Sequence, residues 1–381
     1  MAPKKQRASS AWSGLPSDLL GLVLLRLHSL ADRVHIAAVC RPWRSGARLQ
    51  QLPRAMPWVA LGDEAYLDVA SGGAAVHKLT LGGVPGNTRC SGSAGHLLFL
   101  WRATGGCFLA DPFSGAVLPV ADLALFIRDR TAKEILYLSY RLRLHVHKVA
   151  LLRRPSPHGT SPEPPIVAAL IKNNANKCKT TVFVCRAGKN TGVRKENYRA
   201  MSVDLRLVKD MAFFHGKLYA LLPRDELVAV ELGEGPLGNP AITGVKRVIK
   251  SRYGEDKPYD DFTEDDDEDE RADLGEHDGI LHTGDVYLVP SGEQLLMLRR
   301  WIIYDGTGKT GNTGGFEVLE ADFGGSPPCR WKTVSSSLRG RAIFLGRYCS
   351  ESVHVGDGHY VAQEDCIYFV RHAKDWHLRH E

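Results

Sequence analysis

Beyond residue 57 the chain is dominated by one repeated pattern, in which a turn residue precedes a short strand-like run that contains an aromatic side chain. Apolar runs bounded by Gly, Pro and Ser turns are typical of antiparallel strands. About 320 residues of such strands are too many for one β-sandwich, and they predict a β-propeller with roughly 40–50 residues per blade. The irregular spacing gives no number of blades. The pattern is clearest in GHLLFLW (95–101), GKLYALL (216–222), GDVYLVP (284–290), RAIFLGR (341–347) and DCIYFVR (365–371).

Two stretches predict hairpins in detail. Residues 211–232 indicate three strands joined by tight turns at His215-Gly216 and at residues 223–226. Residues 286–304 indicate another hairpin, with its turn at Ser291-Gly292. We therefore expect the β domain to be built from consecutive antiparallel strands.

The segment before the strands predicts three short helices. Pro16 suits a first helical turn, where Ser17 and Asp18 are expected to supply the cap and a favourable charge. A second helix is expected to start near Ala31, and a third after Pro42. So small a unit cannot bury its own apolar surface, and it needs a partner or a docked neighbouring domain. The apolar residues of the first helix recur at helical spacing on one broad face: Leu15, Leu19, Leu20, Val23, Leu24 and Leu27.

Charge is spread unevenly along the chain. The formal net charge is +6, but residues 260–270 hold nine acids and no base, so the remainder carries +15. Residues 254–278 have no apolar face and predict an exposed, disordered insertion, and residues 153–165 predict a Pro-rich exposed loop. The acidic run could fold back over a basic propeller face and screen it from partners. This hypothesis would fail if deletion of residues 260–270 left the salt dependence of partner binding unchanged.

Amino-acid composition and short sequence patterns exclude some classes of protein and indicate where the chain is located. Hydrophobic residues make up 44% and charged residues 24%, which excludes wholesale disorder. The longest N-terminal apolar stretch, residues 19–25, is far shorter than the roughly 20 residues of a membrane span. The absence of glycosylation sequons favours the nucleus and/or the cytoplasm. The cysteines form no C-x-x-C pair and are expected to be reduced and mostly buried: Cys40, Cys90, Cys107, Cys178, Cys185, Cys329, Cys349 and Cys366.

Several short motifs resemble parts of catalytic or ligand-binding sites, but each of them lacks an element that such a site requires. GTGKTG at residues 306–311 lacks the first Gly of a phosphate loop and is followed by a strand, which favours a hairpin loop. SGSAG at residues 91–95 lacks the first Gly of a nucleophile elbow, which favours a turn between strands. His145 and His147 could hold a metal with a third ligand, although a solvated or channel-facing basic strand face is the favoured interpretation. We therefore predict no catalytic, cofactor-binding or metal-binding residues, no cofactor and no nucleic-acid partner.

The N-terminal segment resembles an F-box. The matching residues run from Leu15-Pro16 through the Asp18-Leu19-Leu20 run and Val23-Leu24 to the Val39-Cys40-Arg41 stretch with Trp43 and Arg44. His28 stands where the motif often has Pro, and Gly21 lies inside the first helix at some cost in helix propensity. The resemblance implies docking on a Skp-type adaptor, which links the chain to a cullin–RING ligase. The residues implied to bind the adaptor or hold the helices together are Leu15, Pro16, Leu19, Leu20, Val23, Leu24, Leu27, Val39, Cys40 and Trp43.

The remainder resembles the C-terminal domain of a large plant family of F-box proteins with a kelch-like, KIB-type β-propeller. The phrases that carry it include residues 92–120, 208–221, 287–300 and 330–346. The expected fold is an α+β multidomain chain, with a disordered basic tail (1–12), a three-helix F-box (13–54) and a mainly antiparallel, propeller-like β domain (55–381).

The resemblance implies a non-enzymatic substrate receptor of an SCF-type (Skp–cullin–F-box) ubiquitin ligase, with an unknown protein substrate on the β domain. One alternative is an F-box scaffold or inhibitor that supports no ubiquitination. Another is a propeller enzyme, which a polar, convergent site with shifted pKa values at the central channel would favour.

Overall fold

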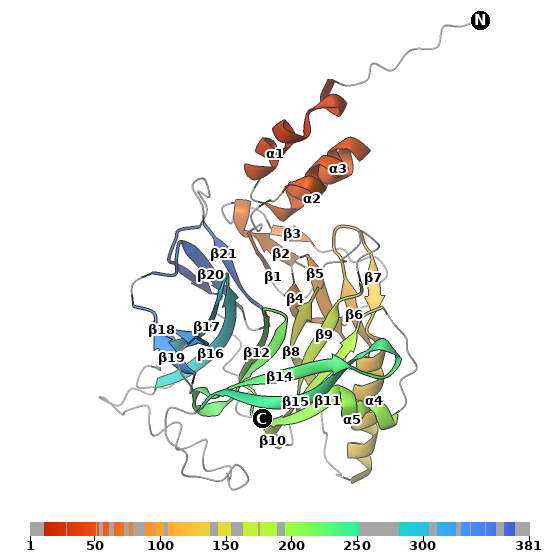
Figure 1. The fold of residues 1–381 in the computed structure, drawn as a ribbon, viewed down its shortest axis with the longest axis vertical. Coiled ribbons are helices and arrows are strands. Elements are labelled where there is room, and N and C mark those ends of the chain that lie inside the picture. Colours follow the sequence, from red (N-terminus) through yellow and green to blue (C-terminus); the bar gives the residue numbers. More distant parts are fainter. Residues whose placement is uncertain are drawn as a thin grey trace, which may run out of the picture.

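Three helices precede a long series of strands in the computed structural model of the chain (Figure 1). The structure describes residues 11–27, 29–50, 52, 56–60, 65–71, 76–78, 88–94, 96–102, 106–137, 144–153, 163–173, 176–188, 195–250, 282–304, 311–324, 329–335, 337–346, 348–355 and 362–369. Residues 1–10, the acidic run, most of the Pro-rich loop and His28 lie outside this part of the chain, so the predictions made for them stay predictions.

The three expected helices are present. A 3-10 turn η1 (Ala11–Gly14) leads into α1 (Ser17–Leu25), α2 (Leu30–Val39) and α3 (Arg41–Leu49). The expected cap of α1 was wrong, because Pro16 occupies the N-cap position and no side chain caps the helix. The second helix is capped by Ser29, whose Oγ accepts a hydrogen bond from the backbone N–H of Ala31 at 3.2 Å.

The strands that follow form six hydrogen-bonded sheets. Four of them are four-stranded antiparallel meanders, and they account for most of the β domain. They are β4 (Arg89–Ala94), β5 (Leu97–Trp101), β6 (Cys107–Ala110) and β7 (Val117–Pro119); β8 (Leu144–Leu152), β9 (Ile166–Asn173), β10 (Asn176–Arg186) and β11 (Ser202–Arg206); β12 (Asp210–Phe214), β13 (Lys217–Leu221), β14 (Leu227–Glu234) and β15 (Pro240–Ile249); and β16 (His282–Ser291), β17 (Gln294–Tyr304), β18 (Gly311–Asp322) and β19 (Arg330–Thr333).

A fifth sheet completes the ring. It consists of β20 (Arg341–Leu345), β21 (Ser350–His354) and β22 (Ile367–Phe369), and β22 pairs parallel to β20. Strands β4, β8, β12, β16 and β21 contact one another in that order and form the inner wall. The ring closes where the hydroxyl of Ser93 in β4 donates to the Cys349 sulfur, 3.1 Å away and just before β21. The predicted propeller is therefore confirmed, and it has five blades.

The sixth sheet lies between the last and the first blade. It contains β1 (Trp58–Ala60), β2 (Ala65–Asp68) and β3 (Val76–Lys78), with a 3-10 turn η2 (Val69–Ser71) after β2. On one side Met56 and η2 pack against the last blade. On the other side Trp58 lies 4.8 Å, between ring centroids, from Phe113 of the first blade. We call this sheet, β1–β3 with η2, the wedge sheet.

Apolar side chains fill the spaces between neighbouring blades. The first and second blades enclose Phe99 and Phe183, the third and fourth enclose Leu227 and Met297, and these side chains are buried. Burial of apolar surface between blades is the main force that holds such a ring together. The helix α4 (Ala121–Tyr137) follows the first blade and packs on the same core as the second. Shorter helical turns are η3 (Lys195–Asn197), α5 (Tyr198–Met201), η4 (Pro223–Asp225) and η5 (Pro236–Gly238).

Both detailed hairpin predictions are confirmed. β12 and β13 are joined by His215 and Gly216, whose φ angles of 46° and 75° are those of a tight hairpin turn. The turn between β16 and β17 lies one residue later than expected, at Gly292 and Glu293. The connection that carries GTGKTG joins the antiparallel strands β17 and β18, as expected for a hairpin loop.

Two smaller expectations were wrong. Residues 91–94 lie within β4 rather than in a turn, and the Ser91 hydroxyl accepts a hydrogen bond from the indole N–H of Trp101 at 2.7 Å. Among the cysteines described, Cys107 and Cys185 are buried, whereas Cys40, Cys90, Cys329, Cys349 and Cys366 are half-buried. No helix among the described residues is long and apolar enough to cross a membrane.

Candidate functional site

The first helix presents apolar side chains to solvent. Leu19, Leu22, Val23 and Leu25 are 49%, 59%, 40% and 46% exposed. At 100° per residue these four positions share one side of α1. A helix that is apolar all round is normally buried on all sides. The outward side of α1 therefore presents apolar surface that the described residues leave uncovered, and we define the outer face as Leu19, Leu22, Val23 and Leu25.

The opposite side of α1 faces the other helices. Leu20 and Leu24 are buried, and Leu20 packs on Gly46 of α3, where a Cβ atom would approach its methyl group to 2.9 Å. Gly21 likewise leaves room for the Gln50 side chain, which donates to the Ser17 carbonyl at 3.1 Å. The helix-propensity cost of Gly21 therefore permits close contact between the first and third helices.

The remaining residues implied by the F-box resemblance are divided between these two environments. Val39 is exposed, as is Pro16, while Leu15, Leu27 and Cys40 are half-buried. Trp43 is half-buried, and its indole N–H donates to the Trp12 carbonyl at 2.8 Å, which attaches η1 to α3. Adaptor binding by all ten residues stays a prediction. The sequence interpretation did not include the exposed side chains Leu22, Leu25, Leu49 and Trp12.

A buried hydrogen bond joins the helices to the wedge sheet. The Ser29 hydroxyl, which caps α2, donates to a carboxylate oxygen of Asp68 at 2.5 Å. The other oxygen of Asp68 accepts from the backbone N–H of Ala70 at 3.0 Å. Both Ser29 and Asp68 are buried. This buried polar contact thus helps to hold the helices on the wedge sheet.

The inner wall of the propeller contains a buried ion pair. The ammonium of Lys148 in β8 lies 2.5 Å from Asp210 in β12. The same carboxylate accepts backbone N–H bonds from Met211 at 2.7 Å and from Leu288 in β16 at 2.8 Å. Nearby, burial raises the pKa of Tyr287 to about 12, which keeps its hydroxyl neutral. Asp210 therefore fastens three blades together, and its oxygens are occupied by structural bonds.

The two histidines of β8 do not form part of a larger ligand set in the described chain. The rings of His145 and His147 lie edge to face with centroids 6.2 Å apart. A bulge between Val146 and Lys148 interrupts the pairing of β8 at this point. No group of three or more His, Cys, Asp or Glu suited to a metal is present among the residues the structure describes.

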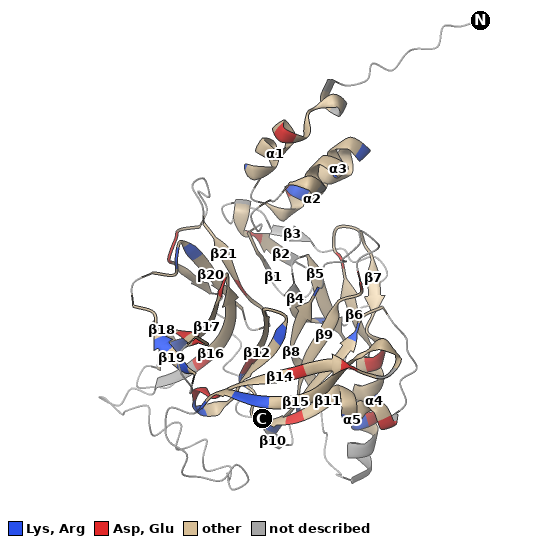
Figure 2. Ribbon diagram, viewed as in Figure 1, with Lys and Arg blue, Asp and Glu red and all other residues tan. Residues whose placement is uncertain are grey.

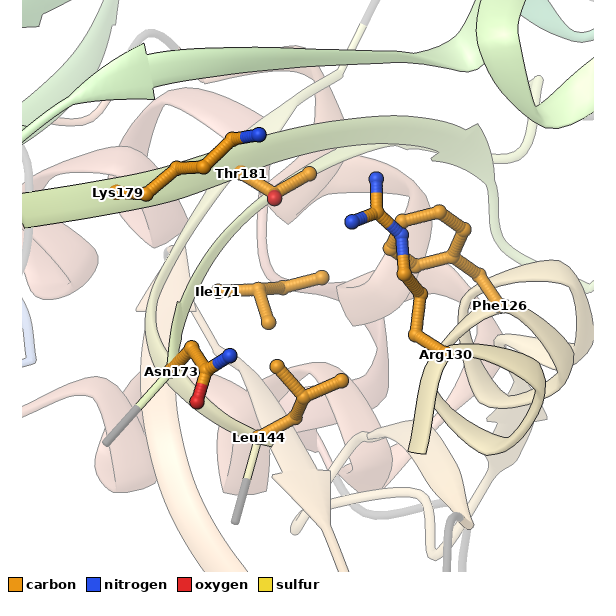
Figure 3. Close-up of a pocket in the computed structure, with 7 residues that line it drawn as sticks. All are labelled: Phe126, Arg130, Leu144, Ile171, Asn173, Lys179 and Thr181. Carbon is orange, nitrogen blue, oxygen red and sulfur yellow. The ribbon is translucent and has the colours of Figure 1, made fainter. Parts of the chain in front are cut away.

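A pocket lies between α4 and the second blade (Figure 3). Its volume is about 210 Å³, and its lining combines an apolar floor with polar side chains: Phe126, Arg130, Leu144, Ile171, Asn173, Lys179 and Thr181. Figure 3 shows Lys179, Thr181 and Arg130 along one side, and Leu144 and Asn173 opposite. The pocket extends along one face of the second blade, from Leu144 at the start of β8 to Lys179 and Thr181 of β10.

A carboxylate on β11 organises the polar side of the pocket. Asp204 accepts a hydrogen bond from the Thr181 hydroxyl at 2.6 Å and pairs with the Lys179 ammonium at 2.9 Å. Its distance to the Arg130 guanidinium is longer, 3.7 Å. Although burial alone would raise it, the hydrogen bonds from Thr181 and Lys179 hold the pKa of Asp204 below its ordinary value. The carboxylate is thus ionised at neutral pH.

The sequence interpretation missed this pocket because it missed α4. No helix was expected at residues 121–137, where α4 lies. The signal was present: Leu123, Phe126 and Ile127 have the i, i+3, i+4 spacing of a helix face, and Asp122 stands in the first turn. Residues that lie four apart on that helix, Phe126 and Arg130, form one wall of the pocket.

Comparison with known proteins gives two findings. A protein-family model described as KIB1-4 beta-propeller matches residues 66–380. A segment of 36 residues is 47% identical to F-box protein At2g17690 of Arabidopsis thaliana. That segment covers 9% of this chain and 9% of the relative, so the likeness concerns only a small part of either protein.

Proposed function

The chain belongs to the KIB1-4 β-propeller family, and we propose that it is the substrate-receptor subunit of an SCF-type ubiquitin ligase. In this proposal the outer face of α1 docks on a Skp-type adaptor, which connects the chain to a cullin and a RING subunit. The propeller binds a target protein. The receptor performs no covalent chemistry and raises the concentration of the target near the ubiquitin-conjugating enzyme.

The outer face is the observation that carries the proposal. It places four apolar side chains of one short helix in solvent, where they match the helix-in-groove mode of recognition. The short likeness to an F-box protein supports the same partner class. The two buried oxygens of Asp210, held by Lys148 and two backbone N–H groups, favour a structural role for the inner wall over a catalytic one.

Two assays test the proposal. The full chain should co-purify with a Skp-type adaptor, and a chain that lacks residues 11–49 should not. The reconstituted complex with cullin and RING subunits should then support ubiquitination of proteins captured by the propeller. Failure of the full chain to bind any Skp-type adaptor would contradict the proposal.

The second assay separates a receptor from a scaffold. A chain that binds the adaptor and a propeller partner, yet supports no ubiquitination of that partner, would act as a scaffold or inhibitor. We also propose a nuclear or cytoplasmic location, which fluorescence microscopy of the tagged full chain would test.

A further inference from the structure

The pocket between α4 and the second blade has the size of a site for one amino-acid residue. Its volume of about 210 Å³ is below the range of roughly 300–1,000 Å³ typical of sites for drug-sized ligands. Its floor is apolar, with Phe126 and Ile171 buried and Leu144 half-buried. Such a floor gains free energy from covering an aliphatic side chain.

The mouth of the pocket favours a negative charge. Arg130 and Lys179 together carry two positive charges, and Asp204 carries one negative charge, so this group has a net charge of +1. Asp204 is bonded closely by Lys179 and Thr181, while Arg130 is 3.7 Å away. The guanidinium therefore retains donors that a second carboxylate could use.

The cationic groups are held in place before any ligand arrives. The Arg130 guanidinium lies 5.4 Å from the centroid of the Phe126 ring, and Asp204 fixes the Lys179 ammonium. Both cationic side chains are also partly open to solvent, at 37% and 54%. Preorganised donors reduce the entropy lost on binding, and the open mouth leaves an exit for the rest of a longer ligand.

From these observations we propose that the pocket binds the C-terminal residue of a peptide chain, with an aliphatic side chain on the floor and the α-carboxylate at Arg130 and Lys179. The last residue of a chain carries both groups on one Cα atom, so the two halves of the pocket are occupied together. This inference deepens the proposed function, because it names the feature of the target that the propeller would recognise. Only one part of the inference depends on the proposed function, namely that the bound peptide belongs to a target of the ubiquitin ligase.

Direct binding to the purified full chain tests the inference. The probe is an N-terminally labelled peptide, Gly-Ser-Gly-Ser-Leu, with a free carboxylate, and fluorescence polarisation reports its binding. Its amidated twin should bind at least tenfold more weakly, because it loses the charge-assisted hydrogen bonds. A twin that ends in Ser should also bind more weakly, because it leaves the apolar floor uncovered.

Substitutions in the pocket provide the second arm. Arg130→Gln should weaken binding of the free-acid peptide about tenfold or more, since a hydrogen bond to a charged group is lost. Arg128→Gln is the matched control, because it removes the same charge from an exposed position of the same helix. This control should leave the affinity unchanged, and thermal unfolding of both variants should match that of the parent chain.

Four results would overturn the inference. They are no binding of the free-acid peptide at concentrations up to about 1 mM, equal binding of acid and amide, equal losses from Arg130→Gln and Arg128→Gln, and displacement by free 4-methylpentanoate at concentrations no higher than those of unlabelled peptide. The last result would assign the pocket to a small organic acid instead of a peptide end. Because none of these assays contains the adaptor, their failure is distinct from failure of the Skp-type adaptor to bind.

Discussion

The double substitution Leu19→Ala with Leu22→Ala should weaken adaptor binding while leaving the helices folded. Both side chains belong to the outer face and expose about half of their surface, 49% and 59%. Covering a fully exposed leucine contributes about 1.5–3 kcal/mol. The half that remains to be covered on docking therefore contributes about 0.8–1.5 kcal/mol for each residue.

The two truncations together should cost about 1.5–3 kcal/mol of binding free energy, which raises the Kd roughly tenfold to a hundredfold. Leu22→Asp alone should cost more, because docking would bury an unpaired carboxylate in an apolar groove. Isothermal titration calorimetry of the full chain with a Skp-type adaptor measures the change. Leu237→Ala is the matched control, since Leu237 is an exposed leucine of η5 in the third blade.

Thermal unfolding must accompany the calorimetry. Truncation of Leu20 or Leu24, which are buried between the helices, should lower stability by about 2–5 kcal/mol and abolish docking by unfolding. Those two positions thus report on folding, whereas the outer face reports on docking. A folded Leu19→Ala, Leu22→Ala chain with an unchanged Kd would refute the assignment of the outer face to the adaptor.

Three further predictions concern stability and reactivity. Ser29→Ala removes both the cap of α2 and the hydrogen bond to Asp68. It should lower the free energy of unfolding, measured by chemical denaturation, by about 0.5–2 kcal/mol. An unchanged free energy of unfolding would show that these two hydrogen bonds do not stabilise the fold. Asp210→Ala leaves the Lys148 ammonium buried without its carboxylate and should cost about 3–5 kcal/mol, part of which Lys148→Met should restore in the double variant. Burial raises the pKa of Cys107 to about 12, so its thiol should resist alkylation at pH 8 until the chain is unfolded. The unfolded thiol ionises near pH 9, so the contribution of Cys107 to the stability of the fold should be present below that pH and be lost as the pH rises toward 12. Rapid alkylation of Cys107 in the native chain at pH 8 would contradict its burial.

Local features of this protein could be predicted from its sequence, because they depend on neighbouring residues. The hairpin at His215-Gly216 has two strand-like runs on either side of a turn that tolerates positive φ. The start of α2 follows from Ser29, a good cap before a helical run. Repetition of such hairpins sufficed to predict a propeller.

Features that depend on distant contacts could not be predicted in this way. Ser93 and Cys349 close the ring across 256 residues, and no local pattern marks either of them. The two sides of α1 could not be distinguished by periodicity, because leucines occupy positions on both. The acidic run gave a hypothesis about a basic face, and Figure 2 shows acidic residues along β14 beside basic residues along the neighbouring strand β15. The run itself lies outside the described residues, so the screening hypothesis stays a prediction.

The position of the wedge sheet has a mechanical consequence. A ring of blades without a covalent closure opens at its seam, between the first and last blades. The wedge sheet contacts both of those blades, and the helices are attached to it through Ser29 and Asp68. A partner that pulls on the helices would therefore load the wedge sheet, which lies at the seam. A chain without this sheet would lose packing on both end blades and the Ser29–Asp68 bond to the helices at the same time, so one element supports both the seam and the attachment of the helices.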